Sequence, residues 1–98
     1  MSCGAPDQSA APATVATGQT VVSGRVVAGG EPVGGAFVRL LDASGEFTGE
    51  VVSSSAGEFR FYAAPGEWTV RALHRSGNGQ ASVRADGPGV HPVDVSVG

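Results

Sequence analysis

Cys3 carries the most reactive side chain in this sequence. It is the only cysteine among 98 residues, so it cannot form an internal disulfide, and we expect a free thiol in a reducing compartment. A thiolate is both a nucleophile and a sulfur acceptor. Two interpretations stay open: Cys3 accepts or relays sulfur, or it is a thiol without a role.

The two histidines, His74 and His91, could join Cys3 in a metal site with two nitrogen ligands and one sulfur ligand. Their spacing is not one that a metal site requires, so we predict no metal and no cofactor. The sequence also has no nucleophile elbow, no glycine-rich phosphate loop and no paired-acid motif. We therefore expect no independent catalytic activity.

The charge balance argues against nucleic acid as a partner. Six basic residues, all arginine, stand against nine acids, and the net charge is -3, whereas phosphate binding needs clustered cations. No stretch approaches the 18 or more apolar residues that span a bilayer, and there is no signal-peptide pattern at the start. We expect a cytoplasmic protein that does not bind membranes.

The elements that must position these residues are strands. Residues 1–18 are rich in Ala, Pro, Ser and Thr, which predicts a disordered tail carrying the only cysteine. From Thr20 onward, apolar and polar residues alternate. The pattern predicts one domain over residues 19–98, with strands at 20–28, 36–42, 47–53, 58–63, 67–75, 79–85 and 90–97. Such a chain is expected to form an all-β fold, a seven-stranded antiparallel β-sandwich of the immunoglobulin-like kind.

Strand parity predicts which side chains face the core. The inward apolar residues are Val22, Val26, Val38, Leu40, Phe47, Val51, Phe59, Phe61, Trp68, Val70, Val83, Val93, Val95 and Val97. Gly24 and Ala36 share this parity, so we predict that they let neighbouring backbone or rings approach closely.

The opposite parity places arginines beside apolar residues. The outward residues on these strands are Phe37, Arg39, Leu41, Arg60, Tyr62, Arg71 and Leu73. Exposed apolar side chains next to arginine are typical of a protein interface, so we expect a partner face, which could also serve a homodimer. The alternative is a solvated face on which the arginines pair with Glu50, Glu58 and Glu67.

Glycine, proline and aromatic residues recur at a recognisable spacing between residues 20 and 76. The pattern is Gly24-x-Val26, Gly30-x-Pro32, Gly35-Ala36-x-Val38-x-Leu40, Gly57-x-Phe59-x-Phe61 and Pro65-Gly66-x-Trp68-x-Val70. It resembles the carboxypeptidase regulatory-like domain, a transthyretin-type β-sandwich, and the resemblance implies that fold. The transthyretin-like hydrolases of purine catabolism end in Tyr-Arg-Gly-Ser, which this chain does not, so we expect no such hydrolase.

The longer run from Phe37 to Leu73, with a cysteine close to the start of the chain, resembles a small actinobacterial family of unknown function. Members of that family are linked to thiosulfate sulfurtransferases of the rhodanese type. The resemblance implies an accessory protein of sulfur metabolism, with Cys3 as the sulfur acceptor and a sulfurtransferase as the partner. The broader alternative is a protein-interaction module without sulfur chemistry.

Overall fold

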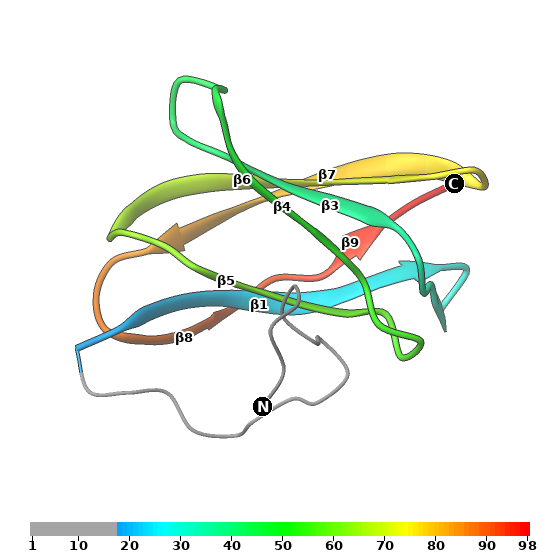
Figure 1. Cartoon of the computed structure of the whole chain (residues 1–98), viewed down its shortest axis with the longest axis horizontal. Coiled ribbons are helices and arrows are strands. Elements are labelled where there is room, and N and C mark those ends of the chain that lie inside the picture. The colour runs from blue at the N-terminus through cyan, green and yellow to red at the C-terminus, as the bar shows by residue number, and fades with distance from the viewer. Residues whose placement is uncertain (1–17) are drawn as a thin grey trace, which may run out of the picture.

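The computed structural model describes residues 18–98, which form two packed β-sheets (Figure 1). The predicted all-β sandwich is confirmed. The predicted tail and Cys3 lie outside the described residues, apart from Gly18.

Nine strands within residues 18–98 make up the two sheets. Their bounds are β1 Thr20–Ala28, β2 Glu31–Pro32, β3 Phe37–Leu41, β4 Phe47–Val52, β5 Glu58–Tyr62, β6 Gly66–His74, β7 Gly77–Ala85, β8 Gly89–Pro92 and β9 Val95–Ser96. All seven predicted strands are present, and their predicted ends agree with the observed ones to within one or two residues. The difference in number comes from the short β2 and from the division of the last predicted strand into β8 and β9.

The four-stranded sheet has the order β4-β3-β6-β7 and is antiparallel throughout. In the five-stranded sheet, β1 is the central strand: β2 and β5 pair with it in antiparallel fashion, and β8 and β9 pair with it in parallel. The C-terminal chain therefore follows β1 along its length, and Figure 1 shows it rising toward β7 at its end.

The last predicted strand is interrupted at Val93 and Asp94. The amide of Val93 donates to the carbonyl of Ser23, and the Asp94 carboxylate, not a backbone carbonyl, accepts from the amide of Arg25 at 3.1 Å. The Asp94 side chain thus takes the place of one backbone carbonyl in the hydrogen bonding between the strands. Regular pairing with β1 resumes at Val95.

Gly24 permits this arrangement, as predicted. A Cβ at this position would overlap the carbonyl of Val93 and come within 3.2 Å of the Phe59 ring. Gly79 has the same role in β7, because a Cβ there would overlap the carbonyl of Ser96. The C-terminal segment therefore packs against the backbone of both sheets.

The core between the sheets agrees with most of the parity prediction. Nine predicted residues are buried: Val22, Val26, Val38, Leu40, Phe59, Phe61, Val70, Val95 and Val97. Four more are partly buried and pack against them: Val51, Trp68, Val83 and Val93. Burying each large side chain contributes about 1.5–3 kcal/mol, so these residues supply the main stabilisation.

The prediction for Phe47 was wrong, because 61% of this residue is exposed. The pairing of β3 with β4 shifts between Leu40, opposite Gly49, and Leu41, opposite Phe47. The extra residue, Thr48, is a bulge that turns Phe47 to the outside. Val21 differs in the opposite sense: it has the outward parity of β1 and yet is fully buried.

Among residues 18–98 there is no helix with the length and apolar character needed to cross a membrane.

We predict that Gly24→Ala destabilises the fold by about 2–4 kcal/mol, since the new methyl group must displace the Val93 backbone. Gly87→Ala is the matched control: the φ of Gly87 is not positive, and a Cβ added there would have no neighbouring atom within 4 Å. This control should stay within about 0.5 kcal/mol of the wild type. Urea denaturation measures both, and equal losses would contradict the assignment.

Candidate functional site

The outward side of the four-stranded sheet gathers most of the predicted partner residues. In the register of β3 with β6, Phe37 lies opposite Leu73 and Arg39 lies opposite Arg71. Leu41 follows on the same side of β3. Five of the seven residues that the sequence marks are therefore brought together on one surface.

Strand β4 adds three side chains to this surface. Val52 lies opposite Phe37, Glu50 opposite Arg39, and Phe47 opposite Leu41. Phe37 is 51% exposed and Val52 is 49% exposed. Two apolar rows thus flank a charged row, and we call this surface the outer face: Phe37, Arg39, Leu41, Phe47, Glu50, Val52, Arg71 and Leu73.

One ion pair organises the charged row. The Nε of Arg39 donates to the Oε2 of Glu50 at 2.9 Å, with the side chains 45% and 33% exposed. Such a pair contributes only about 0–1 kcal/mol to stability. The guanidinium of Arg71, which lies opposite Arg39 on β6, forms no hydrogen bond or ion pair with another residue of the described range. The row therefore keeps one arginine available to a partner.

Arg60 and Tyr62 do not lie on the outer face. Both are on β5 in the five-stranded sheet, in register with Ser23 and Val21. Tyr62 is 58% exposed, so its outward orientation is as predicted, but it points away from the opposite sheet. Parity predicts the side of a strand, whereas the sheet to which the strand belongs depends on tertiary pairing.

Ser53 fixes the chain that leads into the outer face. Its buried Oγ accepts from the amide of Ala36 at 2.9 Å and donates to the carbonyl of Val33 at 2.8 Å. The Ser53 backbone also bonds to Gly35 and Ala36. These contacts hold the segment before β3 against the end of β4, which sets the position of Phe37.

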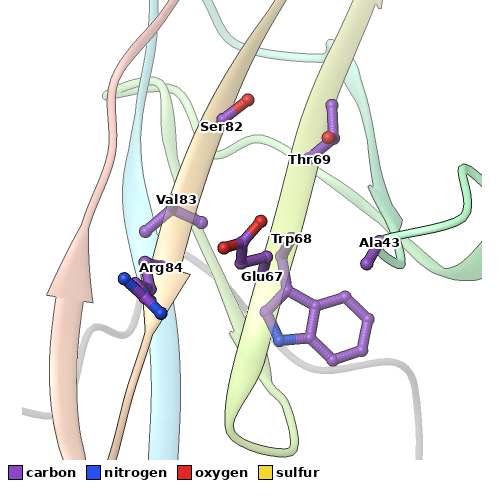
Figure 2. Close-up of a pocket in the computed structure, with 7 residues that line it drawn as sticks. All are labelled: Ala43, Glu67, Trp68, Thr69, Ser82, Val83 and Arg84. Atoms are coloured by element: carbon purple, nitrogen blue, oxygen red, sulfur yellow. The ribbon is translucent and has the colours of Figure 1, made fainter.

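A separate depression of about 320 Å³ lies at the other end of β6 and β7. Figure 2 shows the indole of Trp68 on the side of Ala43, away from Arg84. The indole Nε1 donates to the carbonyl of Ala64 at 2.9 Å, which fixes the ring. The lining residues are Ala43, Glu67, Trp68, Thr69, Ser82, Val83 and Arg84. No histidine or cysteine is among these lining residues to activate the hydroxyl groups of Thr69 and Ser82 for catalysis.

The histidines are not brought together. His74 ends β6 in the four-stranded sheet, and its Nδ1 lies 2.7 Å from the Oγ of Ser76. His91 is on β8 in the other sheet, where its Nε2 donates to the carbonyl of Gly87 at 2.7 Å. Within residues 18–98, no three His, Cys, Asp or Glu side chains are grouped so that they could hold a metal ion.

Asp42 organises the turn between β3 and β4. Its Oδ1 accepts from the hydroxyl of Ser44 at 2.6 Å and from the amides of Ser44 and Glu46 at 2.9 Å. The Ser44 hydroxyl, followed by the Glu46 amide, holds the pKa of Asp42 below its ordinary value of 3.8. This turn delivers Phe47 to the outer face.

Fold and geometry define this chain as a β-sandwich domain. Residues 3–97 match the model of a family described as protein of unknown function, DUF1416. The chain belongs to that family.

Several curated proteins are similar to this chain. Two uncharacterized proteins of Mycobacterium tuberculosis are 65% identical to it over 65 residues, which is 66% of this chain and 65% of each relative. An uncharacterized protein of Mycolicibacterium smegmatis is 66% identical over 65 residues, or 72% of that protein. The match to the M. tuberculosis proteins thus spans somewhat less than two thirds of their length.

Solved structures also share the fold, and one of them serves as an example. It is the dioxygenase domain of a dioxygenase and carbohydrate-binding protein fusion from Streptomyces sp. SirexAA-E. The TM-score is 0.60 at 14% identity, and the match covers 89% of this chain and 84% of that one. At this identity the likeness concerns the sandwich alone.

We predict that Asp42→Asn lowers the free energy of unfolding near neutral pH. Because the pKa of Asp42 is lower in the folded than in the unfolded chain, the carboxylate stabilises the fold above about pH 3.8, and this contribution is lost as the pH falls through the folded pKa. Urea denaturation over a pH series should show the gap to wild type closing on acidification. Ser44→Ala should make the free energy of unfolding depend less on pH, because it removes the main hydrogen bond to the carboxylate. A difference between Asp42→Asn and the wild type that stays constant with pH would contradict the assignment.

Proposed function

We propose that this chain is a non-catalytic module that binds a partner protein through the outer face. The observation that supports the proposal is the pair of exposed apolar rows, in which Phe37, Phe47 and Val52 are 49–61% exposed. Contiguous exposed apolar residues flanking an arginine are characteristic of interfaces. A solvated face held by cross-strand ion pairs accounts for Arg39 and Glu50 but gives no reason for three exposed apolar side chains beside them.

The bulge at Thr48 also favours binding. Regular pairing would place Phe47 in the core, where its ring would contribute to stability. The bulge instead presents the ring to solvent next to Leu41. Bulges often re-aim a side chain for a functional role, and here the re-aimed side chain is a large aromatic ring of the type that anchors interfaces.

The narrower form of the proposal is an accessory role in sulfur metabolism. In this form the partner is a rhodanese-type thiosulfate sulfurtransferase, and Cys3 accepts sulfur in the cytoplasm. The sequence resemblance supports it, and the family match covers residues 3–97, so that Cys3 lies within the matched range. The segment that carries the thiol is therefore part of the family region.

The transfer would be a thiolate exchange at sulfur. The Cys3 thiolate attacks the outer sulfur of the sulfurtransferase persulfide, a new S–S bond forms on Cys3, and the bond to the enzyme cysteine breaks. The enzyme leaves as its thiolate and Cys3 becomes the persulfide. No external oxidant or reductant is needed.

We predict that Phe37→Ser combined with Phe47→Ser weakens binding to such a sulfurtransferase at least about tenfold, because both exposed aromatic contacts of the outer face are lost. Tyr62→Ser is the matched control, since Tyr62 is 58% exposed on the other sheet. Isothermal titration calorimetry measures the affinities, and circular dichroism checks the fold. If the double variant binds as the wild type does, the outer face is not the interface.

We predict that Cys3 gains one sulfur atom when the protein is incubated with the sulfurtransferase and thiosulfate. Intact-mass spectrometry and peptide mapping detect the addition, and Cys3→Ser should abolish it while leaving binding to the outer face unchanged. Unmodified Cys3 beside a modified small-thiol acceptor in the same reaction would contradict sulfur transfer and leave the binding proposal standing.

A further inference from the structure

A depression of about 510 Å³ adjoins the outer face at the Phe37 and Leu73 end. Its lining residues are Gly34, Gly35, Phe37, Leu73, His74 and Arg75. Phe37 and Leu73 lie opposite one another in the β3 and β6 register, so they form an apolar floor. Gly34 and Gly35 line the depression without side chains. This leaves room for an extended ligand to reach the apolar floor.

Two arginines lie beside this floor. Arg75 lines the depression, and Arg71 is the next outward residue before Leu73, about 7 Å away along β6. The guanidinium of neither arginine forms a hydrogen bond or ion pair with another residue between positions 18 and 98. The nearest acid on the outer face, Glu50, is already paired with Arg39 at 2.9 Å.

The charge around the depression is positive, whereas the net charge of the whole chain is negative. Arg39 and Glu50 cancel, which leaves Arg71 and Arg75, unpaired within the described part of the chain, next to an apolar floor in a protein whose net charge is -3. The ring of His74 is held in place, because its Nδ1 forms hydrogen bonds with the hydroxyl and the amide of Ser76. The depression is therefore complementary to a ligand that is both apolar and anionic.

We propose that this depression recognises an acidic peptide segment of the partner protein. An apolar side chain of that segment packs on Phe37 and Leu73, and neighbouring carboxylates pair with Arg71 and Arg75. The inference rests on the proposed function and names the chemistry of the partner at one end of the outer face.

A second copy of the chain fits this depression less well. A two-fold interface places the same patch on both subunits, so it would bring Arg71 and Arg75 of one copy against those of the other. A segment rich in Asp or Glu meets the same surface with opposite charge. Bidentate pairing between guanidinium and carboxylate then adds geometric specificity.

The test is panning of a phage-displayed random peptide library on the purified full chain. We expect enriched sequences that combine a Leu, Ile or Phe with neighbouring Asp or Glu. A synthetic, labelled copy of the most enriched peptide is then titrated by fluorescence anisotropy, and its affinity should fall as salt is raised, because exposed ion pairs are screened.

Four variants locate the peptide. Arg71→Gln with Arg75→Gln should weaken binding about five- to tenfold, and Phe37→Ser should weaken it at least as much. Arg84→Gln is the matched control, since Arg84 is an outward arginine opposite Glu67 at the far end of the same sheet. Phe47→Ser, at the other end of the outer face, should also leave peptide binding unchanged.

The outcomes separate this inference from the proposed function. Enriched peptides without acidic residues, no enrichment, or binding insensitive to Arg71 and Arg75 would overturn acidic recognition. If the peptides depend on Phe47 instead, the outer face binds protein but this depression is not the recognition site. If the arginine variant changes the sedimentation of the protein alone, the occupant is a second copy and the inference is wrong. Loss of sulfurtransferase binding on Phe37→Ser and Phe47→Ser, with peptide binding absent, would leave only the proposed function in place.

Discussion

The packing of the sandwich depends on the close approach of the C-terminal chain to two glycines. At Gly24 the carbonyl of Val93 occupies the place of a side chain, and at Gly79 the carbonyl of Ser96 does the same. These two contacts join the central strand of the five-stranded sheet to the edge strand of the other. Since β1 also carries the core residues Val22 and Val26, the strand that receives the C-terminal chain is also the one that contributes to the core between the sheets.

The outer face has little part in that packing, which is why it is free to bind. Its apolar residues lie on the opposite side of β3, β4 and β6 from the core, and three of them are about half exposed or more. Surface substitutions away from buried contacts usually change stability by less than about 0.5 kcal/mol. Variants of the outer face should therefore report on binding, whereas variants at Gly24 report on folding.

How far the sequence predicts the molecule depends on whether a feature is local. The two-residue period predicts β1 with its observed ends and the outward orientation of Phe37 and Arg39, because alternation is a property of one strand. The position of Phe47 was not predictable in this way, since the bulge at Thr48 exists only relative to β3. The separation of Tyr62 from the outer face likewise depends on the pairing of β5 with β1.

The fold alone does not identify the function of this chain, and its surface is more informative. A dioxygenase domain from Streptomyces has the same sandwich at 14% identity, and a shared sandwich of this kind is compatible with unrelated activities. What distinguishes this chain is the placement of charge: an acidic protein keeps two arginines, unpaired among residues 18–98, beside an apolar floor formed by Phe37 and Leu73. Within this arrangement Arg71 lies opposite Arg39, and like charges directly opposite one another on a sheet are destabilising. The acidic segment that we propose as the ligand would supply a carboxylate for the arginines and an apolar side chain for the floor at once.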